Sequence, residues 1–226
     1  MLSNYLTLRQ LLSPQELNQV LLLVNQATFQ TGSKSASSDA ASVKNNLQIR
    51  AEENAQAQQI GQIVMAAFSR SSLLQSVVMP KAILPPLVSI YRENMSYGTH
   101  VDSPLMGAQY TIRTDVGMTL FLSEPDTYEG GELRVITEAG EKTFKLNAGD
   151  AVLYPTTKLH EVRPVVSGTR IAVVTWMQSA IRDAHKREIL FNLHSSINEL
   201  TGENLHKERV KLQQVYSNLV RMWAEL

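Results

Sequence analysis

The chain has 226 residues, enough for one sizeable domain with an extension or for two small domains. Its 21 lysines and arginines balance its 21 aspartates and glutamates, so the composition does not favour a nucleic-acid partner. Cysteine is absent, which excludes disulfides and thiolate metal sites, so any bound metal has to use histidine and carboxylate ligands.

The start of the chain predicts neither secretion nor membrane insertion. Residues 1–5 lack the basic region and apolar run of a signal peptide. The richest apolar run, residues 20–24, is far too short to span a bilayer. We therefore expect a cytoplasmic protein without a membrane partner.

Two amphipathic helices are predicted in the first 70 residues. Ser13 can cap the first, Pro14 suits its first turn, and Glu16 can bond back to the cap amide. Apolar residues then recur at helical spacing, namely Leu17, Val20, Leu21 and Val24. The second helix is expected over residues 52–69, with a buried side made of Ile60, Ile63, Val64, Ala67 and Phe68. Residues 31–42 are rich in Ser and Ala without periodicity, which predicts an exposed loop.

From about residue 77 the pattern changes to short runs of β-branched and aromatic residues separated by turn residues, which indicates an all-β region. The expected strands are residues 77–84, 87–92, 117–122, 132–136, 142–146, 151–154, 161–165 and 170–176. Short strands joined by tight turns suggest a jelly roll, or double-stranded β-helix, in which two sheets enclose a pocket.

Beyond residue 178 the pattern is helical again, with helices expected over residues 181–193 and 203–226. Apolar residues recur in the second at helical spacing, namely Leu212, Val215, Leu219, Met222 and Leu226. We expect these faces to pack on the β core or on each other, and a homodimer contact is the alternative. The predicted class is α+β, with an N-terminal helical support region (1–76), a jelly-roll core (77–178) and a C-terminal helical extension (179–226).

Three residues of the β region suit one metal ion. His100 and Asp102 are two positions apart, so an extended backbone places both side chains on one face. His160 lies at the start of a predicted strand, where a ligand is held rigidly. Two histidines and one carboxylate form the facial triad of non-haem Fe(II) oxygenases, which leaves further coordination positions open. Taken alone, His100 and Asp102 are better explained as turn residues making local hydrogen bonds. The alternative for His160 is a surface histidine in a loop, against which its place at a strand end argues.

Arg170 opens the apolar run 171–176, and its side chain should enter the pocket if it shares a face with Ala172 and Val174. An arginine there suits bidentate capture of a carboxylate, whereas the alternative is an edge arginine in water. The remaining histidines, His185, His194 and His206, fall in or beside the C-terminal helices, where we expect surface or packing roles.

Taken together, these residues carry a family resemblance. In chain order, Tyr91, the stretch 97–102, Gly130-Gly131-Glu132-Leu133, Gly149-Asp150, His160 and Arg170 resemble the Fe(II)- and 2-oxoglutarate-dependent dioxygenases. Within the prolyl- and lysyl-hydroxylase-like group, the chain is most similar to the bacterial PKHD-type hydroxylases. That similarity includes Arg113-Thr114-Asp115, the stretch 119–123 and the helical extension. The wider resemblance covers about residues 77–178, and the narrower one runs through most of the chain.

The resemblance implies that His100, Asp102 and His160 bind Fe(II), that Arg170 pairs with the distal carboxylate of 2-oxoglutarate, and that Tyr91 hydrogen-bonds this cosubstrate. It also implies an enzyme that uses O₂ to hydroxylate a small molecule or peptide, releases succinate and CO₂, and is sustained by L-ascorbate. Some relatives place a Tyr beside the Arg, but residues 118–121 here read Met-Thr-Leu-Phe, so Thr119 or water would take that part.

A non-catalytic module that senses iron or 2-oxoglutarate and signals to a protein partner is the alternative function. The complete ligand set together with Arg170 favours catalysis. A cupin-like enzyme without cosubstrate is disfavoured, because it would need more histidine ligands. The segment 103–115 is expected to border the substrate, with Met106 and Tyr110 either at the entrance or in ordinary packing. The identity of the substrate does not follow from the fold.

Overall fold

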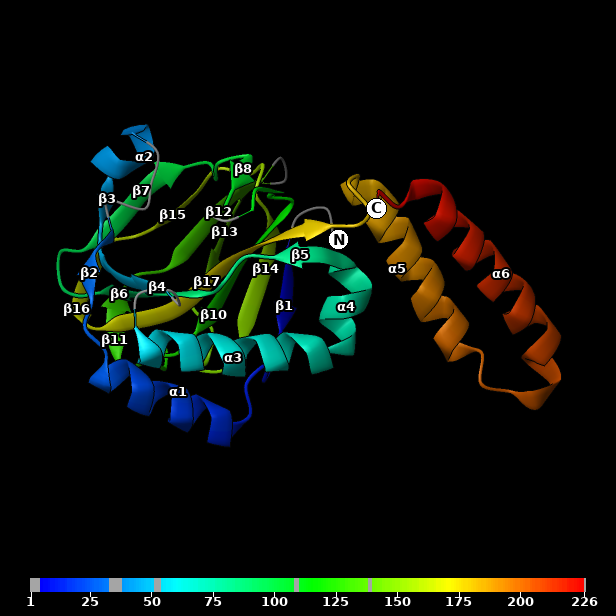
Figure 1. The fold of residues 1–226 in the computed structure, drawn as a ribbon, viewed down its shortest axis with the longest axis horizontal. Helices are drawn as coiled ribbons and strands as arrows, with labels where there is room; N and C mark the ends of the chain where they lie inside the picture. The colour runs from blue at the N-terminus through cyan, green and yellow to red at the C-terminus, as the bar shows by residue number, and fades with distance from the viewer. Residues whose placement is uncertain (1–4, 33–37, 51–53, 108–109, 138–139, 226) are drawn as a thin grey trace.

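Two antiparallel β-sheets lie face to face as a jelly roll, helices cover one outer face, and a helical hairpin projects from one end (Figure 1). The structure, a computed structural model, describes residues 5–32, 38–50, 54–107, 110–137 and 140–225. The predicted α+β class with a jelly-roll core is confirmed.

The larger sheet has the strand order β1-β14-β10-β17-β6-β4-β2, and β5 also pairs with β17. Its strands are β1 (Leu6–Leu8), β2 (Gln30–Thr31), β4 (Leu47–Arg50), β5 (Pro80–Ile83), β6 (Leu87–Tyr91), β10 (Val116–Phe121), β14 (Ala151–Pro155) and β17 (Arg170–Ser179). Strands from the first 50 residues therefore extend the sheet, where the sequence predicted only helices and a loop.

The smaller sheet has the order β13-β12-β15-β7-β3. Its strands are β3 (Lys44–Asn45), β7 (Ser96–His100), β12 (Leu133–Thr137), β13 (Gly140–Phe144) and β15 (His160–Val162). Two ribbons complete the β structure, β8 (Leu105–Met106) with β9 (Ile112–Arg113), and β11 (Tyr128–Gly130) with β16 (Val165–Gly168).

Alternate side chains of the larger sheet serve two different cores. In β10, Met118 and Leu120 join the core under the helices α1 (Pro14–Gln26) and α3 (Ala55–Arg70). Phe121 of the same strand packs toward the smaller sheet, and Thr119 lines the pocket between the sheets. Because the helices occupy one face in this way (Figure 1), the other face is left to form a site.

The predicted N-terminal helices are confirmed. Ser13 and Glu16 form a reciprocal capping box at the start of α1, and Val20 and Val24 are buried. In α3 the predicted side faces the core: Ile60, Val64, Ala67 and Phe68 are buried and Ile63 is partly buried against them.

Removing the cap of α1 has a defined expected effect. Ser13→Ala deletes the hydroxyl that accepts from the Glu16 amide, so the free energy of unfolding should fall by about 1 kcal/mol. Urea denaturation measures this loss. Ser76→Ala is the control, because its hydroxyl bonds the Leu73 carbonyl at an exposed site and caps no helix start; an equal loss in both variants would contradict the capping assignment.

Three predicted elements are wrong in detail. Residues 77 and 78 end a helix, α4 (Ser72–Val78), because the Ser71 side chain accepts from the Leu74 amide and caps it, and Met79 ends it with φ 47°. Residues 38–42 of the predicted loop form the short helix α2 (Ser38–Ser42), and residues 33–37 lie outside the described residues. The strand predicted at 161–165 is split into β15 and β16 around Pro164, which has no backbone N–H to donate.

The C-terminal extension consists of α5 (Ala184–Glu199), the 3-10 turn η2 (Glu203–Leu205) and α6 (His206–Trp223), and the two helices pack on each other as an antiparallel hairpin (Figure 1). Arg113 forms ion pairs with both Asp115 of the β core and Glu225, and so connects the C-terminal end of the extension to the core. The expectation that all of the α6 apolar face packs is wrong for Val215 and Met222, which are exposed. Leu226 lies outside the described residues.

Among the residues that the structure describes, none of the helices has the length and apolar character needed to cross a bilayer.

Candidate active site

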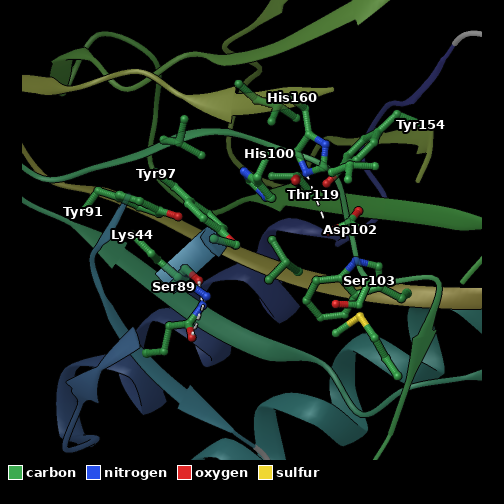
Figure 2. Close-up of a pocket in the computed structure, with 18 of the residues that line it drawn as sticks. Lys44, Ser89, Tyr91, Tyr97, His100, Asp102, Ser103, Thr119, Tyr154 and His160 are labelled. Atoms are coloured by element: carbon green, nitrogen blue, oxygen red, sulfur yellow. Dashed lines mark hydrogen bonds and ion pairs between the residues drawn. The ribbon is translucent and has the colours of Figure 1, made fainter. Parts of the chain in front are cut away.

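A pocket between the two sheets contains the candidate metal ligands and the candidate cosubstrate residues, and Figure 2 labels four of them, Tyr91, His100, Asp102 and His160. Its lining includes His100, Asp102, His160, Arg170 and Tyr91. The rest of its wall is Ala40, Lys44, Gln48, Ser89, Tyr97, Val101, Ser103, Met106, Thr119, Leu133, Tyr154, Val162, Val174 and Trp176. Both sheets contribute, so the jelly roll itself assembles the site.

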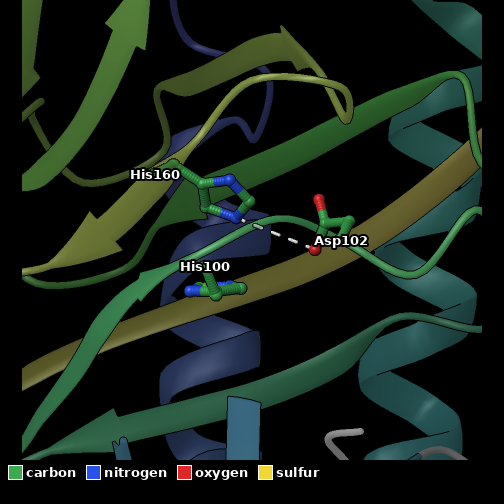
Figure 3. A group of neighbouring side chains, drawn as sticks. All are labelled: His100, Asp102 and His160. Atoms are coloured by element: carbon green, nitrogen blue, oxygen red, sulfur yellow. Dashed lines mark ion pairs between the residues drawn. The ribbon is translucent and has the colours of Figure 1, made fainter. Parts of the chain in front are cut away.

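Strand pairing brings the two histidines together. β7 ends at His100, β15 begins at His160, and the register places these two residues directly opposite each other. Their ring centroids are 4.3 Å apart. Asp102 follows just beyond β7, and its Oδ1 lies 3.7 Å from Nε2 of His160 (Figure 3). One ligand atom from each of the three residues lies within 4.8 Å of the others, so a single metal ion fits this group.

Backbone hydrogen bonds fix the orientation of both imidazoles. Nδ1 of His100 lies 2.8 Å from the Gly98 carbonyl oxygen, and Nδ1 of His160 lies 3.0 Å from that of Lys158. A carbonyl only accepts, so Nδ1 is the donor in each ring, and in a neutral imidazole this leaves the lone pair on Nε2. Histidines that bind metals are commonly oriented by such a bond on the other ring nitrogen.

The electrostatics of this group favour a cation. Burial, together with the neighbouring His160, lowers the pKa of His100 to about 3, so this imidazole is neutral near pH 7. Burial raises the pKa of the Asp102 carboxyl, although His160, the Trp176 side chain and Lys44 oppose this. Oδ2 of Asp102 is buried and has no hydrogen-bond partner within the described parts of the chain. A cation between these groups would compensate the buried carboxylate, and two nitrogens with one oxygen suit a transition metal.

Aromatic rings hold the histidines from the sides. The Tyr97 ring stacks on His100 at a centroid distance of 3.6 Å, and the Lys44 ammonium lies 4.8 Å from the centroid of the Tyr97 ring. The Tyr154 ring lies 5.0 Å from His160. Gly117 on the adjacent strand makes room for that ring, since a Cβ there would lie 2.9 Å from it. The pKa of the Tyr154 hydroxyl is raised, chiefly by burial, so it stays protonated.

Arg170 is the largest of the side chains that are almost fully buried, with 1% exposed. It begins β17 opposite Tyr91 of β6, and its guanidinium carbon lies 5.2 Å from the Tyr91 ring centroid and 5.3 Å from that of Phe121. Its Nε and one terminal nitrogen have no hydrogen-bond partner among the residues described. Unpaired guanidinium donors in a pocket fit the carboxylate of a bound anion.

The sequence predictions for the neighbouring residues have mixed outcomes. Met106 lines the pocket, whereas Tyr110 is exposed and its hydroxyl donates to the Ile83 carbonyl. Lys44, Tyr97 and Tyr154 were not predicted as pocket residues. They could not be found from spacing alone, because Lys44 comes from an edge strand of two residues and Tyr97 from a strand that the pattern did not predict. Tyr154 could have been predicted, because side chains alternate between the two faces of a strand and Tyr154 therefore shares the face of Val152 in β14.

The remaining histidines lie in the C-terminal helices, as expected. His185 and His194 belong to α5 and His206 begins α6. The His194 ring packs 5.3 Å from that of Tyr216. Within the described ranges, the residues grouped as a possible metal site are His100, Asp102 and His160 alone.

Two family models match the chain. The 2OG-Fe(II) oxygenase superfamily matches residues 86–178, and the PKHD-type hydroxylase C-terminal domain matches residues 184–225. A PKHD-type hydroxylase of Synechococcus sp. (strain JA-2-3B'a(2-13)) is 43% identical over 219 residues, which are 95% of this chain and 96% of the relative. One from Acinetobacter baumannii (strain SDF) is 42% identical over 220 residues, again 95% and 96%.

Solved structures share the fold. A prolyl-4-hydroxylase from Pseudomonas putida has a TM-score of 0.55 at 15% identity, with 78% of this chain and 93% of that chain covered. A prolyl hydroxylase from Trichoplax adhaerens, solved with a peptide fragment of hypoxia inducible factor, has a TM-score of 0.56 at 17% identity, with 83% and 87% covered. From the identity of its relatives along almost its whole length, the chain belongs to the PKHD-type hydroxylases of the 2OG-Fe(II) oxygenase superfamily, and it is an Fe(II)- and 2-oxoglutarate-dependent dioxygenase.

Proposed function

We propose that the pocket between the sheets is the active site, with His100, Asp102 and His160 as the Fe(II) ligands. Arg170 then pairs with the distal carboxylate of 2-oxoglutarate, and Tyr91 hydrogen-bonds the same cosubstrate. One observation carries this assignment. The same pocket holds three convergent ligand atoms within 4.8 Å of one another and a buried guanidinium with unpaired donors.

Bound Fe(II) and 2-oxoglutarate would supply the oxidising chemistry that hydroxylates a C–H bond and releases succinate and CO₂. The chain's own residues bind the metal and the cosubstrate, orient them, and keep water out of the pocket. The hydrogen bonds on Nδ1 of His100 and His160 keep both Nε2 atoms facing the metal position. Leu133, Val162 and Val174 keep part of the wall apolar. Thr119 lines the same pocket, which supports a role in assisting Arg170 directly or through water.

The proposed substrate is a small molecule or peptide that enters beside residues 101–106. Val101, between two proposed ligands, is 51% exposed and also lines the pocket. Ser103 and Met106 line the wall just beyond. The exposure of Val101 at this wall of the pocket supports this entry route.

A binding and turnover experiment tests the assignment. Purified protein with Fe(II) and 2-oxoglutarate under anaerobic conditions should give a weak visible charge-transfer band, and air should then produce succinate. Untargeted mass spectrometry of cell extract incubated with the enzyme should reveal a product heavier by one oxygen. A band without succinate formation or any oxygenated product would instead support the sensor function.

Three further properties are proposed. Ascorbate sustains turnover by reducing the iron again, which the dependence of succinate yield on ascorbate would test. The protein works in the cytoplasm, where reduced iron and 2-oxoglutarate are available. It forms a homodimer through the exposed apolar residues of α5 and α6, including Ile189, Val210 and Met222. Fractionation and analytical ultracentrifugation test these two statements.

The division at residues 76 and 178 is also a proposal. The boundary at 178 is supported by the two family matches, because the first ends at residue 178 and the second begins at residue 184. The matches do not bear on the boundary at 76, and strands of the first 50 residues belong to the sheets.

A further inference from the structure

Asp102 is held in place differently from the two histidines. His100 and His160 belong to paired strands and face each other across the ladder. β7 ends at His100, so the backbone that carries Asp102 continues outside any strand until β8 begins at Leu105. Some other contact has to fix this segment if the carboxylate is to stay beside the histidines.

Thr114 supplies that contact with two donors. Its hydroxyl donates to the carbonyl oxygen of Ser103 at 2.6 Å, and its amide donates to the carbonyl oxygen of Pro104 at 3.0 Å. These are the two residues that directly follow Asp102. Thr114 itself is 5% exposed, so both bonds are shielded from water, which would otherwise compete for the carbonyls.

Thr114 is bound in turn to the loop that leads to His160. Its carbonyl oxygen accepts from the hydroxyl of Thr156 at 2.5 Å, and Thr156 is 3% exposed. The Thr156 amide also donates to the Asp115 carbonyl at 3.4 Å. The segment of four residues after Thr156 ends at His160. One buried residue therefore joins the backbone after Asp102 to the backbone before His160.

We propose that Thr114 is a positioning residue for the metal centre: its hydroxyl sets the backbone that presents Asp102, and its carbonyl ties that backbone to the His160 loop. This inference rests on the proposed function, because it assumes that Asp102 and His160 bind a metal. The Arg113-Thr114-Asp115 stretch then has two separate structural roles. Arg113 and Asp115 anchor the C-terminal extension, and Thr114 between them holds the metal-binding loop.

The test compares three variants of the full chain. Thr114→Val keeps the shape and removes the hydroxyl, so the dissociation constant for Co(II), used as an oxygen-stable probe, should rise by about 10- to 100-fold. Thr114→Ser restores the hydroxyl and should bind Co(II) within about 3-fold of the native protein. Thr175→Val is the matched control, because its buried hydroxyl also donates to a backbone carbonyl, that of Leu84 at 2.7 Å, and Thr175 does not line the pocket.

Thermal unfolding of the metal-free proteins separates positioning from general destabilisation. Thr114→Val and Thr175→Val should lose similar stability, whereas only Thr114→Val should lose Co(II) affinity. Equal Co(II) affinity in native protein and Thr114→Val would overturn the proposal, as would an equal loss in Thr175→Val. Native protein that binds no Co(II) at all would overturn the metal site itself, which distinguishes that failure from the failure of Thr114 alone.

Discussion

Asp102→Ala is expected to abolish succinate formation while leaving the metal-free protein as stable as the native one, or more stable. Asp102 is the only anionic member of the ligand group, so its loss should weaken metal binding by more than about 100-fold, beyond the effect of losing an outer partner. The carboxylate oxygen Oδ2 is buried without a hydrogen-bond partner among the described residues, and such a group costs about 1–3 kcal/mol in the metal-free fold. Removing it should therefore relieve a penalty.

Two measurements check this prediction. Anaerobic titration with Fe(II) and 2-oxoglutarate should give no charge-transfer band in the variant, and its melting temperature without metal should equal or exceed that of native protein. Added metal should raise the melting temperature of native protein only. Asp150→Ala is the control, since its Oδ1 accepts from the Gln10 amide at 2.7 Å and its loss should reduce stability but retain turnover. An active Asp102→Ala would remove Asp102 from the ligand set.

The opposite stability effects expected for Asp102 and Asp150 follow from what each side chain does in the fold. A residue that serves the fold has its polar atoms paired inside the protein, whereas a residue that serves a ligand keeps them unpaired until the ligand arrives. Asp102 and Arg170 both carry unpaired buried atoms, and both come from a single pocket. Unpaired buried atoms also occur outside this pocket, at Asn46, Tyr128 and His194, so the site is marked by the convergence of such atoms with three ligand atoms in one pocket.

The sequence predicted the strands whose side chains alternate between two environments. β10, β14 and β17 each have five or more residues, long enough for the period of two to be visible. The strands β2, β3 and β8 have two residues each, and no periodicity can appear in so short a stretch. β2 and β3 pair with the longer strands β4 and β7, whereas β8 pairs with the equally short β9.

Local preference also misled the prediction at residues 77 and 78. Two adjacent valines favour a strand, but the cap at Ser71 and the buried face of Leu74 keep them in α4. The candidate ligands His100 and Asp102 were easier to predict, because they are close together in the sequence. The partner across the ladder, His160, could be identified only as a candidate, since the pairing of β15 with β7 is a long-range property.

Arg170→Ala is expected to lose affinity for 2-oxoglutarate while binding metal normally. Truncating one member of a buried charge pair costs about 2–5 kcal/mol, which corresponds to a dissociation constant about 30- to 5,000-fold higher. The guanidinium has no carboxylate partner in the described chain, so its loss breaks no ion pair, but truncating this buried side chain removes its packing on Tyr91 and Phe121 and should lower stability. Metal binding is therefore measured well below the melting temperature of the variant. Arg170→Lys keeps the positive charge but lacks the paired guanidinium donors. Its dissociation constant for 2-oxoglutarate should lie between those of the native protein and Arg170→Ala.

The cosubstrate itself supplies the decisive control for this prediction. 2-Oxobutyrate has the same 2-oxoacid end as 2-oxoglutarate and lacks the distal carboxylate. Native protein should strongly prefer 2-oxoglutarate in anaerobic titrations of the charge-transfer band, and Arg170→Ala should bind the two acids about equally, because the group that distinguishes them is gone. If the variant keeps the native preference, another cation carries the distal carboxylate. Lys44 is then the residue to replace, since it lines the same pocket and burial lowers its pKa only to about 8, which leaves it largely charged at pH 7.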